Sequence, residues 1–158
     1  MKIDIIKLCE NDKQEIDTIA NWFDNWYEWE KPYWTFKRIR NRLTTMSKSD
    51  RIPAVFVAKV DGQIVATCGI DRFDDTKKTP KYYPWIVNAF VKQEFRGKGI
   101  YKQLLAHAYE HLSKLKYKTI YIRTDWENLY EKLGWKFVKK ITLDNGRIER
   151  LYAYELSK

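Results

Sequence analysis

Hydrophobic and polar positions follow two periods along the chain, and these periods predict its elements. Apolar runs rich in β-branched and aromatic residues predict strands, whereas apolar positions three and four residues apart predict amphipathic helices. The expected strands cover residues 2–8, 54–60, 63–70, 85–91, 119–124, 137–143 and 150–156. The expected helices cover about 14–31, 35–46, 101–115 and a short stretch around Tyr130. Asp61-Gly62, between two strands, is typical of a type I′ hairpin turn.

The order of these elements predicts a mixed sheet in an α/β chain of the α+β type. Hairpins give antiparallel strand pairs, and the strand–helix–strand crossover after residue 91 gives one parallel pair. The 158 residues contain no linker, internal repeat or low-complexity tract. A chain of this length can bury a substantial core, so one domain over residues 1–158 is expected.

The end of the fourth expected strand carries the most specific motif. Two glycines, Gly97 and Gly99, are flanked by Arg96 and Lys98 and followed by an amphipathic helix. Such a turn directs free backbone N–H groups at one point, and the helix dipole and nearby cations favour a phosphate there. A Walker P-loop is excluded, because no Ser or Thr follows Lys98. The dinucleotide-binding pattern fails because Lys102 stands at its third glycine.

This stretch resembles the pyrophosphate loop of the GNAT N-acetyltransferase superfamily, R/Q-x-x-G-x-G/A. Arg96 and Gly99 match the pattern, whereas Tyr101 stands where the family usually has Gly or Ala. A larger residue there could narrow the loop, although its backbone amide remains available. The resemblance implies binding of acetyl-CoA, with the fourth strand separating from the fifth around the pantetheine arm. It assigns the following residues to the cofactor: Phe90, Val91, Arg96, Gly97, Lys98, Gly99, Ile100, Tyr101 and Asn128.

A second segment agrees with the first. Residues 129–135 read L-Y-E-K-L-G-W and resemble the family's short helix that leads into a strand. Gly134 is expected to cap this helix in the left-handed conformation, with Trp135 packing back on it. In the family the tyrosine of this helix lies near the thioester sulfur and protonates the leaving thiolate, a role that maps onto Tyr130. The alternative is that Tyr130 is a core aromatic residue with its hydroxyl at the surface.

The resemblance places the amine acceptor between the first two helices and the last hairpin. Trp26, Glu28 and Trp29 are the predicted acceptor-binding residues, because aromatic rings and carboxylates can hold an ammonium group. The alternative is that this Trp-rich set makes helix-pair contacts. The acceptor is expected to be a primary amine of a small molecule or a peptide N-terminus. The fourth strand holds no carboxylate, so we expect water to relay the amine proton. The candidate bases Asp71, Asp74, Asp75 and Asp125 are interpreted as surface charges.

Charge and cysteine content narrow the remaining choices. The formal net charge of +9 suits a polyanionic coenzyme, and the sequence shows no recognised nucleic-acid-binding signature. The sequence contains neither an apolar stretch long enough to cross a membrane nor a signal peptide, so we expect a cytoplasmic protein, monomeric or homodimeric. Cys9 and Cys68 are expected to be reduced. His107 and His111 lack a third metal ligand, so they are interpreted as surface residues and no metal is expected.

Two other functions compete with catalysis. A non-catalytic domain that binds acyl-CoA or a partner is suggested by Tyr101 and by the absence of a carboxylate on the fourth strand. A basic nucleic-acid-binding protein would show a steep dependence of affinity on salt concentration.

Overall fold

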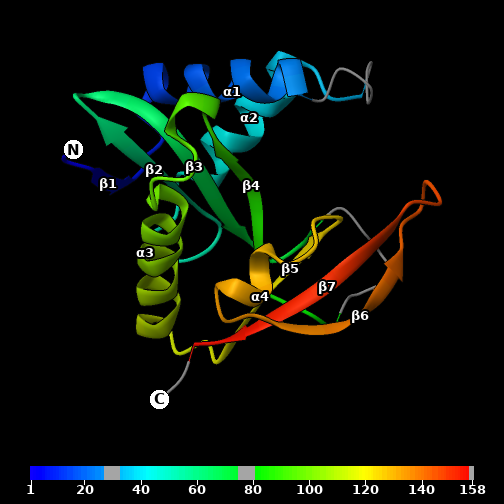
Figure 1. Ribbon diagram of the computed structural model, residues 1–158. Coiled ribbons are helices and arrows are strands. Elements are labelled where there is room, and N and C mark those ends of the chain that lie inside the picture. Colours follow the sequence, from blue (N-terminus) through cyan, green and yellow to red (C-terminus); the bar gives the residue numbers. More distant parts are fainter. Residues whose placement is uncertain (27–32, 75–80, 157–158) are drawn as a thin grey trace.

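The computed structural model describes residues 1–26, 33–74 and 81–156. These residues form a seven-stranded sheet with helices on both faces (Figure 1). Its strands are β1 (Asp4–Lys7), β2 (Ala54–Val60), β3 (Gln63–Asp71), β4 (Trp85–Val91), β5 (Thr119–Thr124), β6 (Lys136–Thr142) and β7 (Ile148–Glu155). The helices are α1 (Lys13–Trp26), α2 (Phe36–Met46), α3 (Ile100–Lys114) and α4 (Leu129–Lys132), with a 3₁₀ turn, η2 (Gln93–Phe95).

The strand order is β1-β2-β3-β4-β5-β7-β6. Neighbouring strands are antiparallel except β4 and β5, which are parallel. The predicted mixed sheet with one parallel pair is therefore confirmed. The strand and helix boundaries agree with the sequence within about two residues wherever the structure describes them. The expected end of the first helix near residue 31 lies outside the described residues. Asp61 and Gly62 have φ values of 51° and 78°, as a type I′ turn requires.

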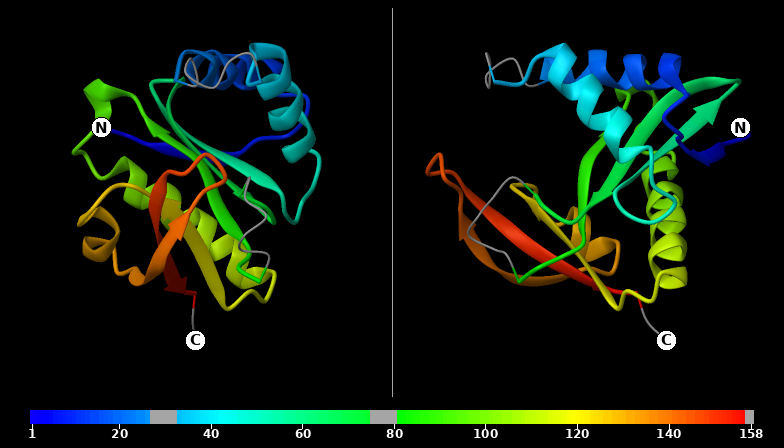
Figure 2. Two further views of the ribbon diagram at one scale, coloured as in Figure 1. Left: turned by 90° about the vertical axis from the view of Figure 1, so that its right-hand side faces the viewer. Right: turned by 180° about the vertical axis from the view of Figure 1, so that it is seen from behind.

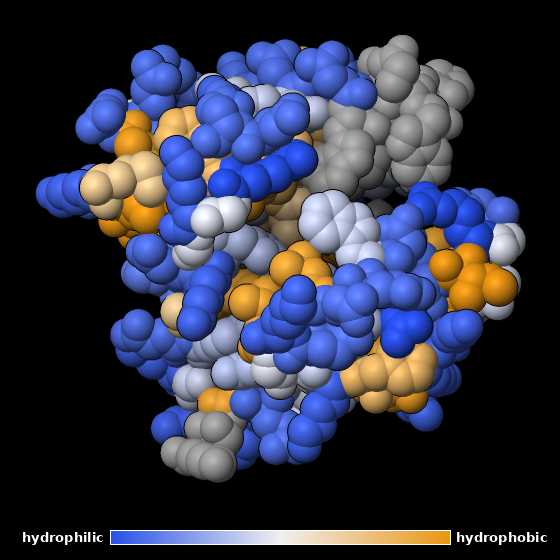
Figure 3. Space-filling model, viewed as in Figure 1, coloured by the Kyte–Doolittle hydropathy of each residue, from blue (hydrophilic) through white to orange (hydrophobic). Residues whose placement is uncertain are grey.

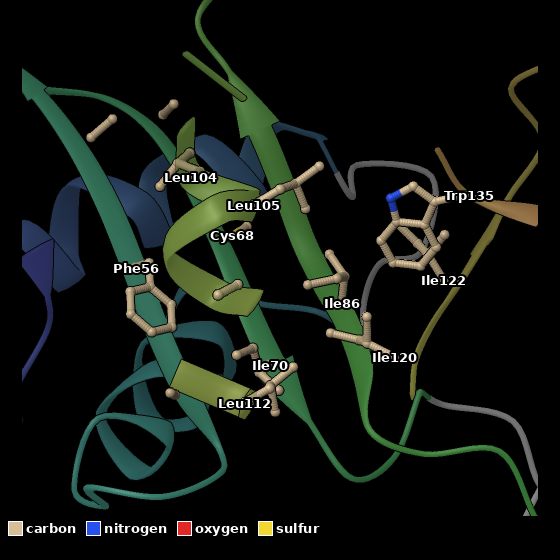
Figure 4. Close-up of a cluster of buried hydrophobic side chains, with 14 of the residues drawn as sticks. Phe56, Cys68, Ile70, Ile86, Leu104, Leu105, Leu112, Ile120, Ile122 and Trp135 are labelled. Atoms are coloured by element: carbon tan, nitrogen blue, oxygen red, sulfur yellow. The ribbon is translucent and has the colours of Figure 1, made fainter. Parts of the chain in front are cut away.

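Two hydrophobic clusters occupy the two faces of the sheet. The first lies between the sheet and α3, where Leu104, Leu105 and Leu112 pack on strand residues such as Cys68 and Ile86 (Figure 4). The second lies under α1 and α2 on the opposite face (Figure 2). Strands covered on both faces read as continuous apolar runs, which explains the composition of β2, β3 and β4.

A bulge in β4 reverses the faces of the sheet toward which the residues after it point. Thr67 pairs with Phe90 and Gly69 pairs with Val87, so Asn88 and Ala89 together oppose one residue of β3. Before the bulge, Val87 packs in the cluster under α1, and after it Phe90 packs against that same cluster. One extra residue shifts the alternation of a strand by one position. Without the bulge, Phe90 would point toward α3.

The conformation of Asn88 explains why asparagine interrupts this apolar strand. Its φ is 53°, in the left-handed region, which asparagine tolerates better than other residues with a Cβ. The polar residue in β4 is therefore placed where the backbone forms the bulge.

We predict that Asn88→Val destabilises the protein by about 1–2 kcal/mol more than Asn88→Gly does, because a β-branched residue is strained at this φ. Urea unfolding of the two variants measures the difference. Equal stabilities would show that the left-handed backbone at residue 88 does not select the side chain.

Candidate active site

β4 and β5 are paired at one end and separate toward the other. Their register joins Trp85 to Tyr121, and the Tyr121 amide donates to the Pro84 carbonyl at 3.0 Å. From there β4 runs toward α1 and β5 runs with the β6–β7 hairpin (Figure 1). The surface is hollowed between these parts (Figure 3). Backbone groups of strands that have separated need partners other than each other. This separation is therefore a place where a ligand could pair with β4.

The Gly-loop, residues 96–101, joins η2 to the first turn of α3. Gly97 and Gly99 have φ values of 74° and 76°, the left-handed region that favours glycine. A Cβ built on either glycine would meet nothing within 4 Å, so a ligand can approach the backbone. The first helical hydrogen bond of α3 runs from the Gln103 amide to the Gly99 carbonyl, at 3.2 Å. Amides earlier in the turn have no helical acceptor, so the loop fits the predicted phosphate site.

Arg96 connects the Gly-loop to the end of β4. Its Nε donates to the Val91 carbonyl at 2.9 Å, and its guanidinium lies 5.9 Å from the centre of the Phe90 ring. Ile100 is buried in the core, so its backbone amide is the part that can face a ligand. Lys98 is exposed, with Nζ 5.5 Å from the Phe95 ring centre. The predicted cofactor residues of β4 and of the loop are thus joined in one structural unit with positive charge at its surface.

α4 holds Tyr130 on the other side of this unit. Asn128, with φ of 70°, precedes the helix, and Gly134, with φ of 90°, follows it. The Trp135 amide donates to the Tyr130 carbonyl at 2.9 Å, and the two rings lie 5.5 Å apart. The predicted left-handed cap and the packing of Trp135 on the helix are confirmed.

The Tyr130 side chain is buried, and its hydroxyl lies 2.9 Å from the hydroxyl of Tyr101. The ring is further enclosed by Trp135 and by Tyr152, whose ring centre is 5.8 Å away. Burial raises the pKa of Tyr130 to about 12, an increase that the hydrogen bond with Tyr101 partly offsets. The hydroxyl is therefore protonated at neutral pH and can serve as an acid.

A cavity of about 340 Å³ lies near the α2 end of the α1–α2 connection and the β6–β7 turn. Its lining combines aromatic, charged and amide side chains, from Tyr33, Trp34, Arg123, Leu143, Asp144, Asn145 and Arg147. Arg123 is paired with Asp74 at 2.7 Å and with Glu149 at 2.9 Å. The volume of the cavity is within the range of small-molecule sites.

The predicted acceptor residues are not described by the structure. Glu28 and Trp29 lie outside the described residues, and Trp26 ends α1 with its side chain likewise outside them. Of the neighbouring tryptophans, Trp22 packs on Phe90 with ring centres 5.2 Å apart, which is a core contact, whereas Trp34 lines the cavity.

The carboxylates considered as bases are engaged in ion pairs where the structure describes them. Asp71 pairs with Arg42 at 3.5 Å, Asp74 with Arg123, and Asp125 with Arg147 at 3.1 Å. Asp75 lies outside the described residues. Each of the three described carboxylates therefore already has an arginine partner.

The histidines and cysteines have ordinary surroundings. His107 is exposed as expected, but His111 is half-buried against Phe56, with ring centres 5.5 Å apart, which corrects its assignment to the surface. Cys9 and Cys68 are both free, as predicted. Within the described residues, no group of three or more His, Cys, Asp or Glu side chains is placed to hold a metal ion. None of the helices in the described ranges is long and apolar enough to cross a membrane.

Two features of the structure were not found from the sequence. The contact between Tyr101 and Tyr130 joins residues 29 positions apart, and no local pattern indicates it. The cavity draws on Arg123 and on the β6–β7 turn, whose residues Asp144-Asn145-Gly146 indicated a turn and nothing more.

Comparisons with known proteins agree with this geometry. Solved structures with the same fold include a protein from Pyrococcus horikoshii OT3 (26% identity, TM-score 0.70, 98% of each chain covered) and aminoglycoside 6′-acetyltransferase type Ii (17%, 0.75, 98% of each chain). A third is the PaiA N-acetyltransferase of Thermoplasma acidophilum in complex with coenzyme A (17%, 0.70, 98% of this chain and 99% of that chain).

Among curated protein sequences, none matches this chain. Residues 18–135, well over half of the sequence, match the acetyltransferase (GNAT) family. The chain therefore belongs to the acetyltransferase (GNAT) family and is an acyltransferase.

Proposed function

We propose that the protein transfers the acetyl group of acetyl-CoA to a primary amine of a small molecule or of a peptide N-terminus, by direct attack in a ternary complex. The observation that carries the proposal is the arrangement around the separated strands. A loop of free amides lies at the end of β4, and a buried tyrosine hydroxyl lies on α4. One group suits the phosphates of the donor, and the other suits its leaving sulfur.

The Gly-loop supports the cofactor assignment. The pyrophosphate would accept hydrogen bonds from the amides of residues 97–101, and Arg96 and Lys98 add positive charge beside them. The pantetheine arm would pair with the backbone of Phe90 and Val91, and Asn128 would contact it near α4. A solved structure of the same fold is described in complex with coenzyme A, which supports coenzyme A as a ligand of this fold.

Tyr130 supports the chemistry. The neutral amine attacks the thioester carbonyl, a C–N bond forms, and the C–S bond breaks. The sulfur takes the proton of the Tyr130 hydroxyl, and the amine proton leaves through water. The Tyr130 hydroxyl, whose pKa is raised to about 12, carries its proton at neutral pH as an ordinary tyrosine does. Asp71, Asp74 and Asp125 are each held by an arginine, so we propose water as the route for the amine proton.

The cavity near Trp34 supports the acceptor class. Its volume of about 340 Å³ suits a small molecule or the end of a peptide. Trp26, Glu28 and Trp29 remain our proposed contacts for the ammonium group.

The direct test is a panel of small-molecule amines and peptides with free N-termini, incubated with acetyl-CoA and monitored by release of free thiol. Release that requires one class of amine supports the proposal and identifies the acceptor. Tight binding of acetyl-CoA without release for any amine would favour the non-catalytic acyl-CoA-binding domain.

We predict that Gly99→Glu abolishes binding of acetyl-CoA, because it puts a carboxylate and a side chain where the phosphates approach the backbone. Calorimetry measures the affinity, and circular dichroism checks folding. Gly62→Glu is the matched control, because Gly62 also has a positive φ and open space but lies in the β2–β3 turn. Unchanged affinity in folded Gly99→Glu protein would refute the phosphate site.

A second prediction concerns the acid. Tyr130→Phe should lower kcat by roughly 10²–10⁴-fold, the range for loss of a general acid, with little change in the affinity for acetyl-CoA, because the ring is kept. Steady-state kinetics with the best amine of the panel measure both constants. Full turnover in the variant would leave Tyr130 with a packing role.

A further inference from the structure

Tyr101 is the residue of the Gly-loop motif that departs from the family pattern, and its side chain reaches the proposed acid. It is the second residue of α3, and its ring meets that of Tyr130 edge-on, with centres 6.4 Å apart and planes at 86°. The first turn of α3 meets α4 through this contact, and both helices contribute to the same hydrophobic cluster. The two hydroxyl oxygens are 2.9 Å apart, so one of the hydroxyls donates to the other.

The direction of this hydrogen bond matters for acid catalysis. A phenol has one proton to donate and can accept through its oxygen. If Tyr130 directs its proton at a departing sulfur, it is left as the acceptor from Tyr101. When that proton is transferred, Tyr130 becomes a phenolate, and a donor already in place stabilises the charge without rearrangement.

We propose that Tyr101 is a positioning residue that donates its hydroxyl hydrogen bond to the Tyr130 oxygen, aiming the Tyr130 proton at the thiolate and stabilising the phenolate that results. This inference rests on the proposed function, because it acts through the acid role of Tyr130. It also gives Tyr101, which replaces the usual Gly or Ala, a use beyond its backbone amide.

The electrostatics of the pair favour this direction. Burial raises the pKa of Tyr101 well above its ordinary value, and the neighbouring Tyr130 and the buried Cys68 thiol raise it further. For Tyr130, burial also raises the pKa, but the hydrogen bond with Tyr101 lowers it. Tyr101 therefore keeps its proton when Tyr130 gives one up.

A third tyrosine, Tyr109, packs in the same group of rings as Tyr101 and Tyr130 and provides a matched control. Tyr109 lies on α3 and belongs to the same group of rings, stacked on Tyr154 with centres 4.2 Å apart. Its hydroxyl accepts from Nε1 of Trp135 at 2.8 Å instead of contacting Tyr130. Tyr109→Phe removes a hydroxyl from the same surroundings without touching the proposed interaction.

The test follows the product, coenzyme A, which needs no acceptor. The pKa of its thiol in the binary complex is measured by NMR titration of the carbon bonded to sulfur. A hydrogen bond from Tyr130 favours the thiolate and lowers this pKa. We expect Tyr130→Phe to raise it by roughly one pH unit. Tyr101→Phe should raise it by part of that amount, Tyr109→Phe should match the unmodified protein, and the double variant Tyr101→Phe/Tyr130→Phe should match Tyr130→Phe.

Kinetics give a second measure once an amine is found. Tyr101→Phe should lower kcat by roughly 10- to 100-fold and leave the KM for acetyl-CoA nearly unchanged, as expected for loss of one hydrogen bond to a developing charge. In the Tyr130→Phe background the same change should have no further effect, because both residues act through one hydroxyl.

The outcomes separate the two proposals. An unchanged thiol pKa in Tyr101→Phe, when Tyr130→Phe raises it, overturns the role of Tyr101 and leaves the acid in place. A further rise in the double variant overturns positioning, because Tyr101 would then act on the sulfur directly. No response to Tyr130→Phe overturns the acid role of Tyr130 and, with it, the role of Tyr101, whereas no binding of coenzyme A overturns the proposed function itself.

Discussion

β4 pairs with β3 along its length but meets β5 at Trp85 and Tyr121, and this unequal pairing is the constraint on which the site depends. β5 is in turn joined to β7 from Thr119 to Thr124, so the two strands belong to different halves of the sheet. The cluster under α3 spans both halves, since Ile86 of one packs with Ile120 and Tyr152 of the other. Hydrophobic burial thus adds to the few hydrogen bonds that join the halves, and beyond the pair β4 keeps backbone groups that a ligand can use.

Three left-handed residues shape the segment that follows this separation. Asn88 makes the bulge, and Gly97 and Gly99 turn the chain from β4 into α3. Because the bulge shifts the alternation of β4, Phe90 faces α1 and lies under the Arg96 guanidinium, which also binds the Val91 carbonyl. The strand, the loop and the helix N-terminus are therefore fixed to one another by short-range contacts. A pre-formed loop of this kind binds an anion with little ordering cost.

Local patterns made most of the fold predictable, and tertiary contacts account for what was missed. β2, β4 and β5 were predicted with their observed boundaries, because short apolar runs between turn residues specify strands. Gly134 was recognised because a left-handed cap has a local signature. The contact of Tyr101 with Tyr130 depends on how α3 and α4 dock, and the position of Arg123 at the cavity depends on the order of the strands. Neither feature can therefore be predicted from the residues adjacent in sequence. The family motif, rather than residue type, singled out Tyr130 among 11 tyrosines.

The distribution of charge is compatible with the proposed cationic acceptor although the chain is basic. The formal net charge is +9, which favours a polyanionic donor and would oppose an ammonium group if it were spread evenly. The positively charged side chains differ in how they are paired with carboxylates. At the Gly-loop, Arg96 and Lys98 are exposed and lie over aromatic rings. At the cavity, Arg123 is neutralised by Asp74 and Glu149, and Arg147 lies beside Asp125. Because salt screens distant charges more than near ones, the local ion pairs influence the potential at each place more than the net charge does. This difference in local pairing is what the proposed donor and acceptor require, since one carries phosphates and the other an ammonium group.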